Sequence, residues 1–330
     1  MTGFDPRFLQ HADVELPVIG GAMYPCSNAE LVAAVSEAGG IGIVQPISLT
    51  YVHGWDYREG IRHIRSLTAK PIGLNALIEQ SSRQYHQRMV RWVAIALEEG
   101  VRFFVTSLGN PRWVVDAVTP HGGIVYHDVT ERKWALKGRD AGVHGLIGVN
   151  QRAGGHAGPL SPQNLFDTLH DLGLPLICAG GVSTPDELVA ALRTGYAGVQ
   201  MGTRFIATPE CRASEVYKRA IVKAGETDIV LTERITGVPV SVIRTPWIER
   251  MGLTAGPFAR WMLRGRRRKR WMRTLYALRS LWQLKRASLD ETGTKDYWQA
   301  GKSVAGIDAI DPVPVILDRF RQSMSELTHG

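Results

Sequence analysis

Short apolar runs alternate with longer amphipathic segments from about residue 16 to residue 206. The apolar runs are four to six residues long and mostly end at glycine or polar residues, which is typical of buried strands. They predict eight strands: Leu16–Gly20, Ile41–Val44, Pro71–Asn75, Arg102–Ser107, Gly123–His127, Gly145–Asn150, Pro175–Ala179 and Gly198–Met201.

The segments between these runs have helical periodicity and the expected end signals. Ser27 or Asn28 can cap one helix, and Pro185 lies in the first turn of another. Several helical patterns stop at a glycine, as a left-handed C-terminal cap predicts. The predicted helices are Asn28–Ala38, Gln84–Glu99, Arg112–Val118, Thr130–Ala141, Pro162–Leu172 and Thr184–Thr194.

Eight strands with a helix after most of them predict an α/β fold of the (β/α)8 TIM-barrel type. An open doubly wound sheet is the alternative, and it predicts a glycine fingerprint after the first strand. Here the phosphate-type glycines follow the seventh and eighth strands instead, which favours the barrel.

The strand–helix rhythm stops after Phe205. We expect residues 1–206 to form the barrel and residues 296–330 to complete it. Residues 207–295 are predicted to be a helical, basic lid or substrate subdomain, with a helix at Ser214–Ala224. The glycine-rich stretch Trp298–Ser303 predicts a loop and Val313–Leu327 a closing helix. This C-terminal third is expected to fold over the open face of the barrel.

The positive charge of the chain is concentrated in one segment. Between Arg260 and Arg286 there are eleven Lys or Arg residues and no acidic residue, and without them the net charge of +8 becomes 8 − 11 = −3. A chain-wide nucleic-acid interface is therefore not implied. The segment is predicted to be an amphipathic helix packed on the barrel. Alternatively, Arg266–Arg268 could bind the phosphates of an acyl thioester substrate, or, less favoured, the segment could contact a membrane surface.

Composition sets the class of protein. The chain is 44% hydrophobic and 21% charged, as in soluble globular proteins. No apolar run reaches the ~18 residues of a membrane span, and the N-terminus lacks a signal-peptide pattern. Cys26, Cys178 and Cys211 are too few and too scattered for a disulfide framework or a metal cluster. A cytoplasmic protein without a metal is expected.

Glycine turns at the ends of the last two strands are the first chemical signal. In barrel enzymes the active site lies at the carboxyl ends of the strands, and the loops after strands seven and eight often hold a phosphate. Gly180 and Gly181 follow the seventh strand, and Gly202 follows the eighth. Ser183 opens a helix whose N-terminus is expected to attract an anion.

A histidine after a glycine pair is the second signal. Gly154, Gly155 and His156 follow the sixth strand, and imidazole exchanges a proton near neutral pH. His127 ends the fifth strand and is, with Gln151, a candidate for lining the site. The other histidines fall on helices or loops.

These motifs together carry a family resemblance. In order and spacing, Ala153–His156, Ala179–Gly181 and Met201–Phe205 resemble the nitronate monooxygenase family, formerly called 2-nitropropane dioxygenases. Gly20–Met23, Gly73–Asn75 and Ala300–Ser303 also look like family positions. The resemblance covers nearly the whole chain.

The resemblance implies a non-covalently bound FMN and one catalytic residue. His156 would face a small-molecule nitronate and assist its binding or the abstraction of a proton, with O2 completing the reaction. The flavin would supply the redox chemistry and the protein its position and electrostatics. The residues implied to contact FMN are Gly180, Gly181, Gly202 and Thr203 at the phosphate, with Ala22, Met23, Asn75, Gly155 and Lys302 around the remainder.

Departures from the family pattern keep other functions open. A family Gly-Ala-Asp reads Gly142-Val-His144 here, a Gln-Gly-x-Glu reads Val149-Asn-Gln-Arg152, and a lysine near the end of strand five is replaced by His127-Asp128. The alternative is an NAD(P)H-dependent FMN reductase or dehydrogenase acting on an acyl thioester or a quinone. A third reading is a non-enzymatic barrel with a basic arm for a membrane or a protein partner.

Overall fold

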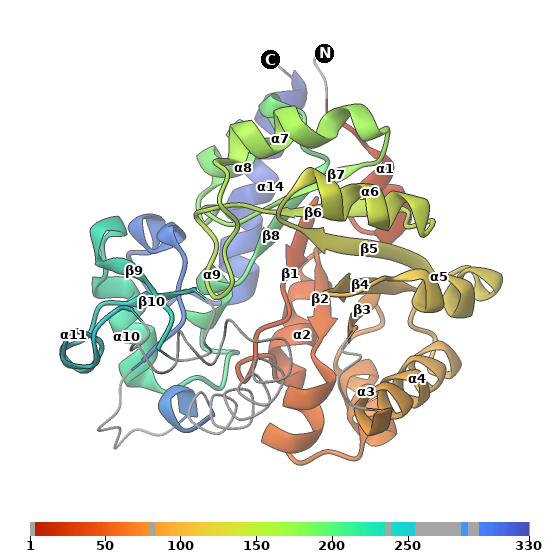
Figure 1. Ribbon diagram of the computed structural model, residues 1–330, viewed down its shortest axis with the longest axis horizontal. Helices are drawn as coiled ribbons and strands as arrows, with labels where there is room; N and C mark the ends of the chain where they lie inside the picture. The colour runs from red at the N-terminus through yellow and green to blue at the C-terminus, as the bar shows by residue number, and fades with distance from the viewer. Residues whose placement is uncertain (1–3, 79–82, 235–238, 255–284, 290–296, 330) are drawn as a thin grey trace.

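Eight parallel strands close into a barrel in which neighbours in the chain are neighbours in the sheet and β8 pairs with β1 (Figure 1). The structure, a computed structural model, describes residues 4–78, 83–234, 239–254, 285–289 and 297–329. The strands are β1 (Val18–Gly20), β2 (Ile41–Val44), β3 (Ile72–Leu77), β4 (Phe103–Ser107), β5 (Ile124–Val129), β6 (Gly145–Val149), β7 (Leu176–Ala179) and β8 (Gly198–Met201).

The closed topology confirms the predicted (β/α)8 barrel. All eight predicted strands are present, and their ends differ from the prediction by at most two residues. An open doubly wound sheet is excluded, because β1 pairs in parallel with both β2 and β8.

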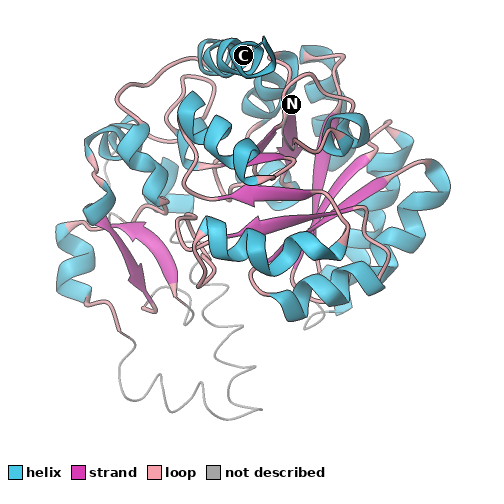
Figure 2. Cartoon of the chain, turned by 90° about the horizontal axis from the view of Figure 1, so that it is seen from above, coloured by secondary structure: helices cyan, strands magenta, loops and turns pink. Residues whose placement is uncertain are grey.

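Helices surround the barrel (Figure 2). Two of them, α1 (Arg7–Ala12) and α3 (Tyr57–Leu67), were not among the predicted helices, although the Asp56 side chain caps α3 by accepting from two of its first amides. The predicted helices are present as α2 (Ala29–Glu37), α4 (Arg83–Glu98), α5 (Arg112–Val118), α6 (Arg132–Asp140), α7 (Pro162–Leu169), α8 (Pro185–Thr194) and, at the C-terminal end, α14 (Val313–His329).

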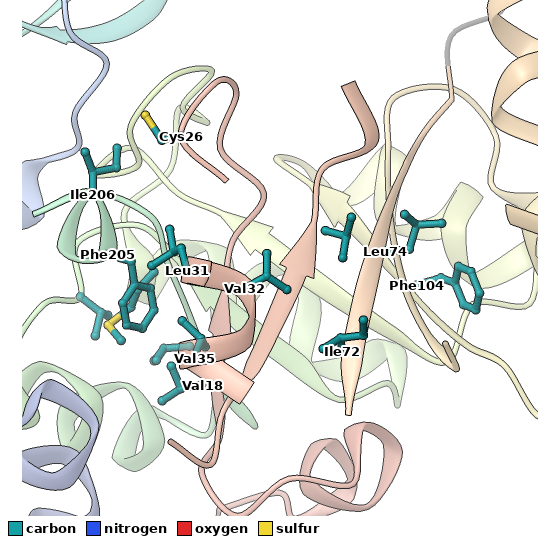
Figure 3. Close-up of a cluster of buried hydrophobic side chains, with 14 of the residues drawn as sticks. Val18, Cys26, Leu31, Val32, Val35, Ile72, Leu74, Phe104, Phe205 and Ile206 are labelled. Carbon is teal, nitrogen blue, oxygen red and sulfur yellow. The ribbon is translucent and has the colours of Figure 1, made fainter. Parts of the chain in front are cut away.

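The two faces of the barrel wall belong to different cores. The outward face packs on the helices, and Figure 3 shows Val18 and Leu74 from the strands near Val32 of α2. The inward face forms a separate apolar core around the barrel axis. Successive strand residues alternate between the two cores because strand side chains have a period of two. Inward residues include Ile19, Ile41, Ile43, Phe103, Val105, Tyr126, Ile147 and Ile177.

A smaller unit follows β8 and lies beside the barrel (Figure 1). Its described part differs from the helical segment expected for 207–295, because two strands, β9 and β10, pair antiparallel within it. The expected helix at Ser214–Ala224 is present as α10. The elements are α9 (Thr203–Ile206), α10 (Glu215–Lys223), β9 (Ile229–Thr232), β10 (Val240–Ile243) and α11 (Pro246–Met251).

Strand β10 joins this unit to the barrel. Its Ser241 exchanges two backbone hydrogen bonds with Gly155 of the loop after β6, and its Ile243 amide donates to the Trp298 carbonyl at 2.9 Å. The basic segment Arg260–Arg286, including Arg266–Arg268, lies outside the described residues except for its last two. Among the described helices, none is both long and apolar enough to cross a membrane.

Candidate functional site

The inward face changes character at the carboxyl ends of the strands. Inside the barrel, the inward face is lined by isoleucine, valine and aromatic side chains. At the ends, the strand register turns polar side chains inward: Asn75 pairs with the inward Val105, Asp128 follows the inward Tyr126 by two residues, and Gln200 packs on Gly21. We call this polar end of the barrel interior, with Asn75, Ser107, Asp128 and Gln200, the barrel mouth.

His127 does not face the barrel mouth, and the expectation that it lines the site is corrected. Its ring lies on the outer face of the wall, where Cδ2 is 3.2 Å from the position of a Cβ built on Gly138 of α6. Its Nδ1 is 2.8 Å from the Thr106 hydroxyl, also on the outer face. Burial lowers the pKa of His127 to about 4, so the ring is neutral at physiological pH.

Asp128, the next residue on β5, takes the inward place. Its Oδ1 atom is buried and has no hydrogen-bond partner among the described residues. Burial raises the pKa of this carboxyl from an ordinary 3.8 to about 7. The side chain as a whole is partly buried and keeps some accessible surface. Sequence reasoning noted Asp128 only as a departure from a family lysine.

The turn that carries His156 is held by backbone contacts. Gly155 has φ +69° and exchanges hydrogen bonds of 3.3 and 2.7 Å with Ser241. A Cβ on Gly154 would lie 2.9 Å from the Gly301 amide nitrogen, so the two backbones touch. Since a β-carbon would prevent these approaches, the glycine pair fixes where the histidine is presented.

His156 itself is accessible and yet enclosed. Its side chain is exposed to solvent, but the surrounding protein lowers its pKa through desolvation. This desolvation favours the neutral imidazole, in which one nitrogen can donate a hydrogen bond and the other can accept one.

The glycine turn after β7 comes very close to the loop after β6. Gly180 and Gly181 have φ of +112° and +82°. A Cβ on Gly180 would lie 2.5 Å from the Ala153 amide nitrogen, and one on Gly181 would lie 2.4 Å from Arg152 Nε. The turn thus offers bare backbone, with an arginine side chain lying across it.

The end of β8 brings several predicted cofactor residues together. A Cβ on Gly202 would lie 3.2 Å from Met23 Sδ, so the loops after β1 and β8 meet. The Thr203 hydroxyl accepts a hydrogen bond of 3.0 Å from the Gly301 amide, next to Lys302. Ala22 packs partly buried against the inner core.

The N-terminus of α8 is different from the expectation. The Glu187 carboxylate accepts hydrogen bonds from the Ser183 amide at 2.7 Å and from the Thr184 amide at 3.0 Å. The Ser183 hydroxyl donates to the Ser303 carbonyl. Because the Glu187 carboxylate already accepts from these two amides, they are not available to an anion, contrary to the expectation for this helix N-terminus.

Charged side chains flank the glycine turn. Arg152 and Lys302 both pair with the Glu226 carboxylate, at 3.2 and 3.3 Å. The Lys302 amide also donates to the Arg152 carbonyl. Lys302 was predicted from the sequence and Arg152 was not, although Arg152 stood in a stretch, Val149–Arg152, that departs from the pattern of the resemblance.

Gln151 is the predicted residue that the structure connects least to the others. It is exposed, and its amide donates to the Leu160 carbonyl at 2.8 Å.

The described residues contain no cluster of three or more histidine, cysteine or acidic side chains suited to a metal ion.

Comparisons with known proteins agree with this arrangement. A family profile described as nitronate monooxygenase matches residues 6–264. A Mycobacterium tuberculosis protein named (3aS,4S,5R,7aS)-5-hydroxy-7a-methyl-1-oxo-octahydro-1H-indene-4-carboxyl-CoA dehydrogenase is 31% identical over 242 residues, which are 72% of this chain but 66% of that protein. A protein from Staphylococcus saprophyticus named probable nitronate monooxygenase is 27% identical over 281 residues, 72% of this chain and 78% of its own.

Among solved structures, FabK from Thermotoga maritima superposes with a TM-score of 0.78 and 28% sequence identity. The superposition covers 98% of this chain and 99% of FabK. The whole chain, including the unit after β8, therefore has a counterpart of known structure.

Proposed function

The chain belongs to the nitronate monooxygenase family, and we propose that it is an FMN-dependent oxidoreductase that acts on an acyl thioester. The observation that carries the substrate class is the charge of the barrel mouth. Its inward polar residues, Asn75, Ser107, Asp128 and Gln200, include no cation, and the one ionisable group among them is a carboxyl. Such a mouth suits an uncharged reacting group, such as a thioester carbonyl, better than an anionic nitronate group.

The residues around the mouth fit FMN. Gly180 and Gly181 form a tight turn with positive φ at the end of β7, packed so closely on Ala153 and Arg152 that neither position could carry a Cβ. The backbone amides of this turn would bind the phosphate. Gly202 and Thr203, at the end of the neighbouring strand β8, would also contact the phosphate. The cations Arg152 and Lys302 lie next to this turn and would offset the phosphate charge. Met23 and Asn75 would then border the ring.

The flavin would supply the redox chemistry when bound. The part of the protein is to bind the thioester and to manage protons. A neutral His156 can donate a hydrogen bond to the thioester carbonyl oxygen or accept a proton from the carbon beside that carbonyl. The surrounding protein partly desolvates the ring, which strengthens such a hydrogen bond.

The acyl-thioester assignment also has support from a relative. The Mycobacterium tuberculosis relative is named as a dehydrogenase of a carboxyl-CoA compound. The match spans about two thirds of that protein, so its substrate is transferred here as a class and not as a molecule. Two cations near the mouth, Arg152 and Lys302, would suit the phosphates of a coenzyme A ester as well as that of FMN.

Nitronate oxidation is the second candidate. It is favoured by the family profile and by the name of the Staphylococcus relative. His156 would then hydrogen-bond the nitronate oxygens, and O2 would be the oxidant in place of a pyridine nucleotide or another electron carrier.

Anaerobic flavin spectroscopy separates the two candidates. The FMN-loaded protein is mixed without oxygen with hexanoyl-CoA, with NADH or NADPH, and with propyl nitronate, and the flavin absorbance is followed. We expect bleaching by the thioester or by a pyridine nucleotide, with trans-2-hexenoyl-CoA restoring the colour of the reduced protein. Bleaching by the nitronate alone overturns the thioester assignment in favour of the second candidate. A protein that takes up no FMN overturns both.

A further inference from the structure

Asp128 is the buried group at the barrel mouth for which the fold gives no structural use. The register of β5 fixes its direction: Tyr126 belongs to the inner core, His127 to the outer face, and Asp128 again to the inside. It is the last inward residue of the strand, at the end of the barrel where the glycine turns and His156 lie.

The carboxyl lacks the partners that a structural carboxylate has. Glu187 in the same fold accepts hydrogen bonds from two backbone amides, and Glu226 forms two ion pairs. Asp128 Oδ1 is buried with no partner among the described residues. An unpaired buried polar atom destabilises a protein, so its presence at a functional end of the barrel calls for a ligand that completes it.

We propose that Asp128 is a proton-exchanging residue of the site, whose Oδ1 atom gives a proton to, or takes one from, the ligand in the barrel mouth. This inference rests on the proposed flavin function and adds a second proton carrier to His156.

The proposed step conserves atoms and charge. When the carboxyl donates, the Oδ1–H bond breaks, the proton passes to a basic atom of the ligand, and the electron pair remains on the carboxylate. The carboxylate is reprotonated by the reverse step or by water. No oxidant or reductant takes part in the transfer itself.

The surroundings keep the carboxyl available in both states. Its raised pKa of about 7 arises from burial alone, with no contribution from a neighbouring charge. The flanking strands present Ser107 from β4, and Ile147 and Val149 from β6, none of which titrates. On its own strand the Tyr126 hydroxyl is bonded to His11 at the other end of the barrel. The loop that carries His156 also reaches the end of β5, since its Gly158 packs against Thr130. Glu131 follows Thr130 in the chain and is partly exposed.

The first test measures the bound flavin and needs no substrate. The midpoint potential of the FMN-loaded protein is measured across the range around pH 7, together with the infrared carbonyl band of a protonated carboxylic acid. We expect the potential to change slope near pH 7 and the infrared band to disappear over the same range. Both features should be lost in Asp128→Asn and kept in Asp116→Asn, which removes an exposed carboxyl from α5.

The second test measures the rate of flavin reduction by the substrate identified above. Asp128→Asn should slow this step by about 10²- to 10⁴-fold and remove its ionisation near pH 7. Reduction at an unchanged rate in that variant overturns the inference while leaving the proposed function intact. If no thioester reduces the flavin but the infrared band still titrates near pH 7 and is lost in Asp128→Asn, the function fails and the role of Asp128 stands.

The inference can also be tested if Asp128→Asn does not fold. A midpoint potential of the wild-type protein that changes linearly with pH through pH 7 overturns the inference without any variant.

Discussion

His127 and Asp128 are neighbours on β5, but their side chains lie on opposite faces of the barrel wall and differ in their hydrogen bonding. On the outer side, His127 is neutral, buried against α6 and paired with Thr106 at 2.8 Å. On the inner side, Asp128 is buried with an unpaired oxygen. Burial moves both pKa values toward the neutral form, down to about 4 for the histidine and up to about 7 for the aspartate.

The difference teaches how to separate a structural polar group from a functional one. Between sheet and helix, the protein supplies the partner itself, as the Thr106 hydroxyl does. At the barrel mouth, Asp128 Oδ1 has no partner among the described residues, and we assign that place to a ligand. Burial and a shifted pKa are common to both residues and do not discriminate between them; a missing hydrogen bond at the carboxyl ends of the strands does.

The largest expected effect comes from His156→Ala. Loss of the imidazole should reduce turnover by about 10²- to 10⁴-fold while the flavin content stays unchanged, because the glycine turns and not His156 hold the phosphate. Turnover and the flavin-to-protein ratio are the measurements. His127→Gln is the control on the outer side, and it should leave turnover unchanged. A loss of turnover in the control would break the comparison.

Opposite pH dependences of stability are the second effect. The folded pKa of His127 is below its ordinary 6.5, so its contribution is present above pH 6.5 and is lost as pH falls toward 4. The folded pKa of Asp128 is above 3.8, so its contribution is present at low pH and is lost as pH rises through 7. Each amounts to roughly 3–4 kcal/mol, so in the wild-type protein they largely cancel.

Single variants should reveal the pH dependence of each contribution to the free energy of unfolding. Relative to the wild-type protein, Asp128→Asn should gain stability as pH rises from about 4.5 to about 7.5, and His127→Gln should lose it. Denaturant unfolding at several pH values measures both. An Asp128→Asn protein that is less stable than wild type at the upper end would show that the carboxylate is paired, contrary to the structure.

A pair of glycine substitutions gives the third effect. Gly181→Ala and Gly122→Ala place an alanine at φ +82° and +74°, with a similar backbone cost of about 1 kcal/mol. Only Gly181→Ala also drives a Cβ toward Arg152 Nε, whereas nothing lies within 4 Å at Gly122. FMN titration should show about tenfold or greater loss of affinity for the first and none for the second.

The smallest effect is expected at the rim of the site. Glu226→Gln removes the carboxylate between Arg152 and Lys302, whose side chains are 28% and 37% exposed. Solvent-exposed pairs contribute about 0–1 kcal/mol, so the unfolding free energy should change by less than that. FMN should bind slightly more tightly, most clearly at low salt, because one negative charge near the phosphate is gone. Weaker binding would show that Glu226 positions the cations.

The sequence predicts the barrel well because strand and helix periods differ. Apolar runs such as Ile41–Val44 and glycine stops after helices mark every strand of the wall. The short strands β9 and β10 were missed, since two four-residue runs outside the regular rhythm carry little periodic signal.

The residues of the site were predicted only in part, for a physical reason. A strand buried on both faces has no alternation of polar and apolar positions, so the sequence does not tell which face a residue takes. His127 and Asp128 were therefore indistinguishable until the register through Tyr126 was known. Glycine turns at strand ends do not have this ambiguity. Gly180, Gly181 and Gly202 were predicted at the carboxyl end of the barrel, and they lie there in the structure.

The pairing of Gly155 with Ser241 has a consequence for biosynthesis. The ribosome completes all eight barrel strands long before Ser241 and Gln299 emerge, yet the loop that presents His156 rests against β10, which in turn bridges to Gln299. A nascent chain can thus close its barrel while the histidine is still without its neighbour.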